Sequence, residues 1–277
     1  MCGIVGYAGV KQAAPILLAG LSKLEYRGYD SAGIAVRDEN SDHIEVVKAK
    51  GRLKNLMEMT DSGRTVHGLC GIGHTRWATH GEPSTVNAHP QYTREKRVVI
   101  VHNGIIENYQ EIKEALVRKG YAFSSQTDTE VAAALLDSYY VEAGKKGLSP
   151  RERALDAIRN MMIRVRGSYA LGILFGDQPG VLYATRKDSP LIIGRCDGEY
   201  EGYMIASDVP AVLNYTRNVV YIDNQEIACL TREAFHLYNI DCEEIEKPFV
   251  EIKWDAAAAE KDGDEHFMMK EIHEQPR

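Results

Sequence analysis

The 277-residue chain is poor in cysteine, and its few cysteines follow no metal-binding or disulfide pattern. Five occur in all, and none forms a C-x-x-C pair with another. The sequence therefore favours neither a zinc ribbon nor a disulfide-stapled scaffold, and we expect a reducing compartment. The five are Cys2, Cys70, Cys196, Cys229 and Cys242.

Long apolar runs and an excess of basic residues are also absent. No stretch approaches the roughly twenty apolar residues that span a bilayer, and the first residues carry no basic segment of the signal-peptide kind. The formal net charge is -7, so the protein lacks the positive field that neutralises a phosphate backbone. We expect a cytoplasmic protein that acts on neither membranes nor nucleic acids.

Motifs for common cofactors are missing as well. No G-x-x-x-x-G-K-[ST] or G-x-G-x-x-G sequence follows a predicted strand, which argues against a nucleotide or NAD. The nine histidines show no H-E-x-x-H pattern or other ligand spacing, so we expect no metal. Neutral, hydrogen-bonded histidines are the better interpretation of the run from His74 to His80.

The pattern in the first half of the chain mixes strands and helices. The run from Cys2 to Tyr7 predicts a strand, and a helix follows with Ile16, Leu17, Leu21 and Leu24 on one face. Two further helix starts are marked by a capping-box pattern from Thr127 to Glu130 and by Ser149 followed by proline. Further strands are predicted at 34–36, 44–47, 69–72 and 98–101, the last ending before His102.

The second half consists of short apolar or alternating runs, which predict a series of antiparallel strands. Strands without a regular βαβ alternation indicate an α+β domain, with two packed sheets and helices outside. The segment 246–264 carries charges and four consecutive alanines, and we interpret it as a surface extension or linker. The predicted strands are 169–175, 181–184, 191–194, 204–206, 219–222 and 226–230.

Cys2 is a candidate nucleophile. If Met1 is removed, the cysteine α-amine lies beside its own thiol, and the two titrate near enough for proton transfer, directly or through one water. Threonine nucleophiles use their N-terminal amine in the same way. A cysteine at position 2 can equally be a small buried hydrophobe, so the interpretation needs further residues.

Polar residues near strand and helix ends provide the further groups that a nucleophilic role for Cys2 needs. Arg76 can hold a carboxylate through two parallel hydrogen bonds. Asn103 and Gly104 can both donate to a developing oxyanion, and Asp128 can pair with an ammonium group. Each also has a structural explanation, as a surface ion pair, a turn or a favourable charge at a helix start. Together they can hold an α-amino acid and attack its side-chain carbonyl.

Several motifs of the chain together resemble those of a known family. They are similar to the glutaminase half of the glutamine–fructose-6-phosphate aminotransferases, which are class II, N-terminal-nucleophile glutamine amidotransferases. The similarity covers residues 2 to about 240, and 269–276 resembles the start of that family's sugar-isomerase half. The motifs that carry it are CGIVG at 2–6, LEYRGYDSAG at 24–33, HTRWATHG at 74–81, NAHP at 87–90, VHNGIIEN at 101–108 and TDTE at 127–130.

The resemblance implies a fold, a division of the chain and a reaction. The fold is a four-layer αββα sandwich of two antiparallel sheets. Residues 1–245 would form the glutaminase domain, and 246–277 a linker and the start of an absent sugar-isomerase domain. The domain would hydrolyse L-glutamine through a Cys2 thioester. In a homodimeric full-length enzyme, the ammonia would aminate fructose 6-phosphate to glucosamine 6-phosphate.

The resemblance also implies residue roles. Cys2 is the nucleophile, with its free amine as base, and Asn103 and Gly104 form the oxyanion hole. Arg76 binds the glutamine α-carboxylate, while Asp128 and Gly104 hold the α-amine. The remaining implied positions are Thr79 and His80 in a loop that closes over glutamine, Trp77 as a gate for ammonia, and Arg27 near the cysteine with a less defined role.

Three alternatives share part of this pattern. Amidophosphoribosyltransferases and asparagine synthetases also use an N-terminal cysteine, but the RWATHG and NGIIEN motifs of this chain resemble theirs less. A catalytically inactive glutamine sensor is the alternative outside enzymes. An intact nucleophile, oxyanion pair and carboxylate clamp argue against it, and steady-state ammonia release separates the two.

The thiol assignment predicts selective labelling. A γ-electrophilic glutamine analogue should modify Cys2 and leave the other four cysteines unmodified, because only Cys2 has a paired base. Peptide mapping by mass spectrometry measures this. Modification of another cysteine with Cys2 untouched would contradict the mechanism.

Overall fold

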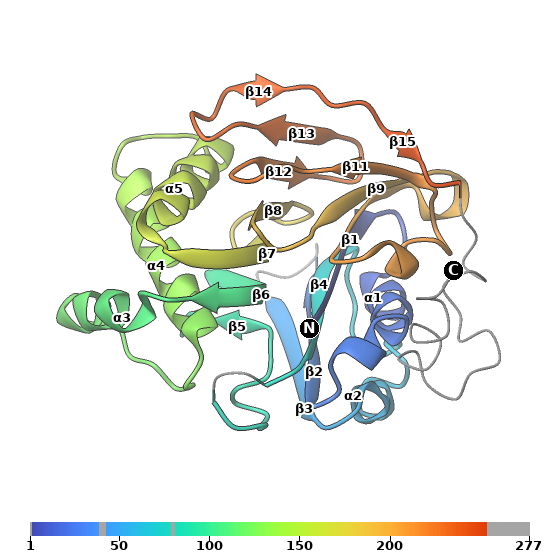
Figure 1. The fold of residues 1–277 in the computed structure, drawn as a ribbon, viewed down its shortest axis with the longest axis horizontal. Coiled ribbons are helices and arrows are strands. Elements are labelled where there is room, and N and C mark those ends of the chain that lie inside the picture. The colour runs from blue at the N-terminus through green and yellow to red at the C-terminus, as the bar shows by residue number, and fades with distance from the viewer. Residues whose placement is uncertain (1, 39–42, 79–80, 254–277) are drawn as a thin grey trace, which may run out of the picture.

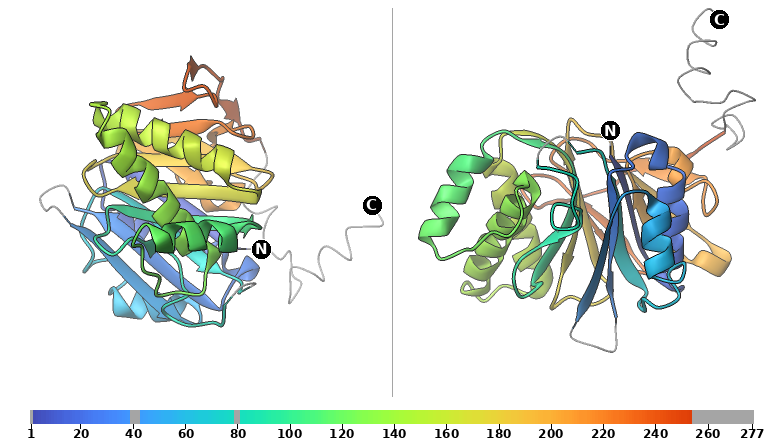
Figure 2. Two further views of the ribbon diagram at one scale, coloured as in Figure 1. Left: turned by 90° about the vertical axis from the view of Figure 1, so that its left-hand side faces the viewer. Right: turned by 90° about the horizontal axis from the view of Figure 1, so that it is seen from below.

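The computed structural model describes residues 2–38, 43–78 and 81–253. Two antiparallel sheets pack face to face, and helices cover the outer face of each (Figures 1 and 2). The view from below in Figure 2 shows the four layers side by side, with the strands of both sheets in the middle. The predicted α+β class and αββα sandwich are confirmed.

The first sheet has eight strands in the order β15-β11-β9-β10-β1-β4-β2-β3. The N-terminal strand β1 lies inside it, antiparallel to both β10 and β4. The residue before β1 is therefore fixed between two neighbouring strands. The strands are β1 (Gly3–Gly9), β2 (Ser31–Arg37), β3 (Ile44–Lys50), β4 (Cys70–Arg76), β9 (Ile192–Cys196), β10 (Gly202–Ala206), β11 (Asn218–Tyr221) and β15 (Val250–Glu251).

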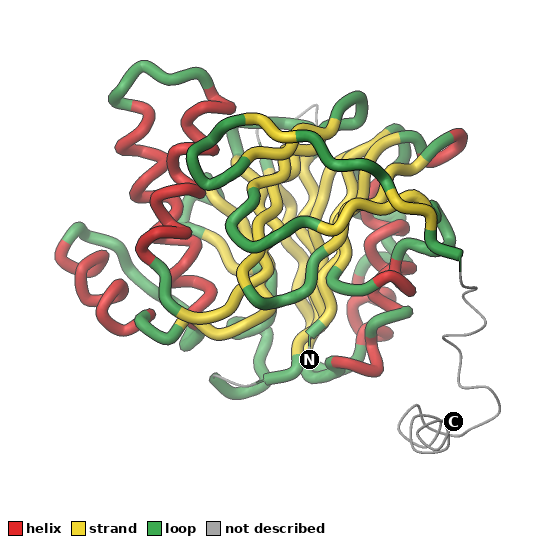
Figure 3. Tube along the Cα trace, turned by 45° about the horizontal axis from the view of Figure 1, so that its top comes forward, coloured by secondary structure: helices red, strands yellow, loops and turns green. Residues whose placement is uncertain are grey.

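The second sheet has seven strands in the order β14-β13-β12-β8-β7-β6-β5. Its longest pairing joins β6 to β7, and the tube in Figure 3 shows the strands of both sheets gathered between the helices. The strands are β5 (Gln91–Tyr92), β6 (Val98–Ile106), β7 (Gly167–Phe175), β8 (Leu182–Lys187), β12 (Ile227–Leu230), β13 (Phe235–Tyr238) and β14 (Glu244–Ile245).

Helices from two parts of the chain cover the two sheets. Those from the first 60 residues lie against the first sheet, and the later ones lie against the second. The sequence patterns did not reveal α2 or α3. The helices are α1 (Ala13–Ser22), α2 (Leu53–Met59), α3 (Tyr109–Arg118), α4 (Asp128–Gly144) and α5 (Pro150–Arg164), with short 3-10 turns η1 (Glu25–Arg27), η2 (Gly198–Tyr200) and η3 (Val209–Ala211).

The alternation of side chains along each strand builds three apolar layers. In β1, Val5 and Tyr7 face α1, whereas Ile4 faces the second sheet. In β6, Val98 and Ile100 face α4 and α5, while alternate residues face the first sheet. β1 and the first five residues of β6 are buried on both faces, which explains why they read as continuous apolar runs.

Two strands extend further than the sequence predicted. We expected β6 to end before His102, but β7 continues to pair with it as far as Ile106. We also expected β4 to end near Gly73, yet its pairing with β2 continues to Arg76. Polar side chains suggested strand ends in both cases. Backbone hydrogen bonds to the neighbouring strand continue through these positions, so the polar residues lie within the strands.

The predicted capping box at α4 is only half formed. Thr127 Oγ1 accepts a hydrogen bond from the Glu130 N–H. The Glu130 carboxylate instead accepts bonds from the backbone N–H groups of Ser124 and Ser125. These donors fold over the helix start and satisfy a buried carboxylate better than one N–H does. At α5, the predicted box between Ser149 and Glu152 is complete, with Pro150 in the first turn.

The described chain continues past the boundary proposed at residue 245. Strand β15 pairs with β11 through Val250 and Val219, at the edge of the first sheet. Ile252 is buried against the layer between that sheet and α1. The assignment of 246–277 to a linker and a second domain stays a prediction, and its residues from 254 onward lie outside the described part.

The capping box of α5 predicts a measurable contribution to stability. Ser149→Ala should lower the free energy of unfolding by about 1 kcal/mol, since the Glu152 N–H loses its acceptor and the Glu152 carboxylate loses the Ser149 hydroxyl. Urea unfolding followed by circular dichroism measures the change. Ser22→Ala is the control, because this exposed hydroxyl only bonds to the Ala19 carbonyl within its own helix. An equal loss in both variants would contradict the assignment.

Candidate active site around Cys2

Cys2 lies directly before β1, where that strand enters the first sheet. The register of β1 and β4 pairs Gly3 with Thr75, so the residues after Thr75 pass beside Cys2. The Trp77 N–H donates to Cys2 Sγ at 3.2 Å, and Sγ lies 3.6 Å from the Trp77 carbonyl oxygen. The sheet pairing thus holds the thiol against the backbone of Trp77.

The environment of the thiol favours its protonated form. Burial raises the pKa of Cys2, and the hydrogen bond from Trp77 and the positive charge of Arg76 oppose this rise only in part. Since a thiolate is the reactive nucleophile, the thiol needs a base to take its proton. The α-amine that removal of Met1 would expose is the nearest group of that kind in the covalent structure.

Asn103 lies on the facing sheet and contacts Cys2 directly. Its Nδ2 donates to the Cys2 carbonyl oxygen at 2.9 Å. Along β6 the alternation turns Asn103 toward the first sheet, as it turns the apolar Val99 and Val101. The predicted oxyanion amide is therefore next to the predicted nucleophile, although 101 residues separate them in the sequence.

Gly104 follows in the same strand with a conformation that requires glycine. Its φ is +131°, and a Cβ at this position would lie 2.1 Å from the carbonyl oxygen of Ser168. A side chain would force β6 and β7 apart at the candidate oxyanion hole. Gly28 has a packing reason of the same kind, since its Cβ would lie 2.9 Å from the Trp77 nitrogen.

Arg76 and Asp128 provide opposite charges at the site. The Arg76 guanidinium is nearly fully buried and donates to the backbone oxygens of Gly81, at 3.1 Å, and Glu82. Burial lowers the pKa of Arg76, while Cys2 and Asp128 raise it. Asp128 begins α4, and its Oδ2 accepts from the Ile106 N–H at 2.9 Å. Both predicted substrate-binding residues therefore lie within electrostatic range of each other.

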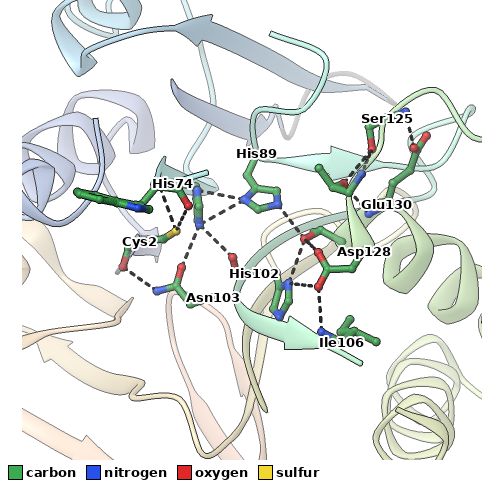
Figure 4. Close-up of polar contacts among 12 residues, drawn as sticks. Cys2, His74, His89, His102, Asn103, Ile106, Ser125, Asp128 and Glu130 are labelled. Carbon is green, nitrogen blue, oxygen red and sulfur yellow. Dashed lines mark hydrogen bonds and ion pairs between the residues drawn. The ribbon is translucent and has the colours of Figure 1, made fainter. Parts of the chain in front are cut away.

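A cluster of buried histidines lies between Cys2 and Asp128 (Figure 4). The three rings of His74, His89 and His102 are 6% exposed or less. Burial lowers the pKa of His74 to about 3 and that of His89 well below its ordinary value. Burial also lowers the pKa of His102, against the charge of Asp128. Each ring takes part in a hydrogen bond, and burial favours its neutral form, while the neutral state itself stays a prediction.

Two predicted residues have other neighbours in the structure. Arg27 forms an ion pair with Asp208, at the start of η3, and its guanidinium lies over the ring of Tyr26. Trp77 is 45% exposed and meets Tyr29 edge to face at 5.5 Å. Their substrate-binding roles stay predictions. Thr79 and His80 lie outside the described residues.

The sequence patterns missed several residues that shape the site. Asp30 accepts a hydrogen bond from the Ala78 N–H and so holds the segment after Trp77. His89 and Thr129 belong to the cluster behind Asn103. All three lie within motifs that carried the family resemblance. Only the direction of each side chain was unknown, and local sequence does not determine it.

No group of three or more His, Cys, Asp or Glu side chains in 2–38, 43–78 and 81–253 is placed to hold a metal ion. Within the same part of the chain, no helix is long and apolar enough to cross a membrane.

Comparison with known proteins identifies similar chains. Residues 59–247 match the family described as the glutamine amidotransferase domain. A protein of Caldanaerobacter subterraneus subsp. tengcongensis is 51% identical over 276 residues, and one of Thermococcus kodakarensis is 46% identical over 278. Both are named glutamine–fructose-6-phosphate aminotransferase (isomerizing). The alignments include the whole of this chain but only 43% and 44% of those proteins.

Solved structures share the fold. The glutamine phosphoribosylpyrophosphate amidotransferase of B. subtilis superposes with a TM-score of 0.70 at 23% identity. The match covers 88% of this chain and 50% of that one. A regulatory enzyme of purine biosynthesis gives a TM-score of 0.71 at 24% identity, covering 86% and 49%. At these identities the likeness concerns the fold alone.

The buried histidines predict a pH-dependent stability. His74 has a folded pKa of about 3 against an ordinary 6.5, so the unfolded chain binds the proton first as pH falls. The stability that these rings contribute is therefore fully present only well above pH 6.5 and decreases as pH falls below it, by about 1.4 kcal/mol for each of His74 and His89 between pH 7.5 and pH 5.5. Urea unfolding at the two values measures the loss.

A substitution within the histidine cluster tests which groups cause the loss of stability between pH 7.5 and pH 5.5. His89→Gln should reduce this loss by about 1.4 kcal/mol, because glutamine does not titrate. His236→Gln is the control, since this partly exposed histidine pairs with Glu244 outside the cluster. An unchanged loss in His89→Gln would mean that other groups cause the pH dependence.

Proposed function

Because the chain belongs to the glutamine amidotransferase family, we propose that it hydrolyses L-glutamine to glutamate and ammonia with Cys2 as nucleophile. The family match bears out the resemblance that the motifs indicated. The observation that supports the reaction most directly is the position of Cys2 against two groups from distant parts of the chain. These are the Trp77 N–H and the Asn103 amide.

The first step forms a thioester. The free α-amine of Cys2 takes the thiol proton, and the sulfur attacks the side-chain amide carbon of glutamine. The carbonyl π electrons move to oxygen, and the resulting oxyanion is stabilised by the Asn103 amide and the Gly104 N–H. When the tetrahedral intermediate collapses, the C–N bond breaks. The proton from the ammonium passes to the leaving nitrogen, and ammonia departs.

The second step restores the enzyme. The α-amine takes a proton from water, and the hydroxide attacks the thioester carbon. A second oxyanion forms in the same place, and its collapse breaks the C–S bond. Glutamate leaves, and the proton held by the amine returns to the sulfur. Both steps need an unblocked amine, so the active form is the protein from which Met1 has been removed.

Recognition of glutamine follows from the charges at the site. Arg76 binds the α-carboxylate, and Asp128 with Gly104 holds the α-ammonium group. A buried guanidinium can form two parallel bonds to a carboxylate, and removal of water strengthens both charge contacts. By resemblance, Thr79 and His80 belong to the loop that closes over glutamine, and Trp77 gates ammonia. Arg27 matches a family arginine near the N-terminal cysteine, with a less defined role.

The chain spans about two fifths of the length of the curated relatives it matches. We propose that it acts within a longer, cytoplasmic, homodimeric enzyme, next to a sugar-isomerase domain. That domain would use the released ammonia to convert fructose 6-phosphate to glucosamine 6-phosphate. The 51% identity to aminotransferases of this name supports this assignment over phosphoribosylpyrophosphate amidotransferase, for which the identity is 23%.

Substitution of the charged clamp tests the proposed function. In protein whose intact mass shows Cys2 at the N-terminus, Arg76→Lys and Asp128→Asn should each lower kcat/KM for ammonia release at least about 30-fold. A point charge cannot replace the guanidinium fork, and a neutral amide cannot balance an ammonium; each such loss costs about 2 kcal/mol or more.

Matched controls come from an exposed ion pair with the same residue types. Arg64→Lys and Asp61→Asn change an exposed surface contact that has no part in the proposed reaction, and both should keep the wild-type rate. Unaltered kcat/KM in the clamp variants would remove the assignment of Arg76 and Asp128. A wild-type protein that releases no ammonia would remove the proposed function itself.

A further inference from the structure

Behind the nucleophile, the buried polar groups form a continuous chain that the proposed reaction does not use. His74 contacts the Asn103 amide, His89 contacts His74, and Thr129 contacts both His89 and Asp128. The chain therefore begins at the proposed oxyanion hole and ends at the proposed ammonium-binding carboxylate. His102 joins it at Thr129.

We propose that His74 is a positioning residue that fixes the orientation of the Asn103 amide, and that His89 and Thr129 tie this orientation to Asp128. The inference rests on the proposed glutaminase function. It adds a residue that touches neither glutamine nor the thiol but determines which end of the Asn103 amide faces the reaction.

The proton on His74 follows from its neighbours. Its Nε2 lies 2.9 Å from Asn103 Oδ1 and 3.0 Å from the His102 carbonyl oxygen. The Asn103 Nδ2 end is already committed as a donor to the Cys2 carbonyl, so the other end of the amide is oxygen. Two oxygens at hydrogen-bond distance require a proton on Nε2. Burial keeps this ring neutral, so Nδ1 carries none.

This tautomer makes the amide orientation selective. If the Asn103 side chain turned over, its NH₂ group would face the Nε2–H of His74, and two donors would meet. Its oxygen would then lie toward Cys2, where the oxyanion must be stabilised by donors. An oxygen in that place would repel the developing charge. The His74 N–H therefore keeps the NH₂ end toward the substrate.

Thr129 connects the histidines to the other end of the site. Its Oγ1 lies 2.8 Å from His89 Nε2, 3.0 Å from His102 Nδ1 and 3.4 Å from Asp128 Oδ1. The His89 ring stands edge to face against His74, with Nδ1 3.2 Å from a nitrogen of that ring. Figure 4 shows the rings of His74, His89 and His102 between Cys2 and Asp128.

Steady-state kinetics of two His74 variants test the positioning role. His74→Leu removes the N–H, and kcat should fall about 100-fold, the loss expected when an oxyanion donor is displaced, while KM stays within about 3-fold. His74→Gln keeps an N–H donor on a side chain of similar reach, and its kcat should stay within about 10-fold of wild type. His236→Leu and His236→Gln are the matched controls outside the site.

A second matched pair tests the connection through Thr129. Thr129→Val keeps the shape and removes the hydroxyl, so kcat should fall about 10-fold. Thr129→Ser keeps the hydroxyl and should retain the wild-type kcat. Equal rates for the valine and serine variants would overturn the connection to Asp128.

Nuclear magnetic resonance of the imidazole nitrogens provides a readout that does not depend on turnover. His74 should be neutral, with the proton on Nε2, from pH 5 to pH 8. A proton on Nδ1 alone, or a charged ring in this range, would overturn the orientation argument. If His74→Leu fails to fold, this measurement on the wild-type protein still tests the proposed tautomer of His74.

The outcomes separate this inference from the proposed function. A wild-type enzyme that hydrolyses glutamine, with His74→Leu equally active, would overturn the positioning role and leave the function standing. A folded His74→Gln as inactive as His74→Leu would show that an N–H donor at this position is not sufficient, which also overturns the positioning role. An inactive wild type would end the proposed function, and the imidazole spectra would still decide the tautomer.

Discussion

The antiparallel pairing of β1 inside the first sheet is the constraint on which the site depends. Because β4 and β10 hold both sides of β1, the residue before the strand has no freedom to move away from the sheet. Cys2 is thereby held against the Trp77 backbone, and the facing sheet presents Asn103 to it. The proposed nucleophile lies near a chain end, normally the most mobile part of a protein, yet the sheet fixes it.

The same two sheets enclose an apolar layer that turns polar at one end. In β4, Ile72 faces this layer, and so does His74 two residues later. In β6, Val101 faces the layer, and so does Asn103 two residues later. Polar groups in such a place are costly unless each finds a partner. The histidine and amide satisfy one another across the sheets, so the end of the core becomes a rigid and specific site.

The helix layer on the second sheet takes part through the first turn of α4. Hydrogen bonds of Thr127 and Glu130 fix this turn. The turn then places Asp128 and Thr129 beside the end of β6. The strand alternation sends His102 toward the helix and Asn103 toward the first sheet. One strand therefore contacts both the nucleophile and the acidic helix start, and the two regions share a single polar chain.

The sequence alone determined the class of fold, most strands and the family, because apolar alternation and long motifs are local signals. Residue types and motifs also proposed Cys2, Asn103 and Asp128 as site residues, and the structure places Asn103 next to Cys2. It could not show that β4 and β6 continue through polar residues, because the partner strand decides where pairing ends. Nor could it show that His74 faces Asn103 or that Arg27 meets Asp208, since those contacts join segments 29 and 181 residues apart, and only tertiary packing brings such segments together.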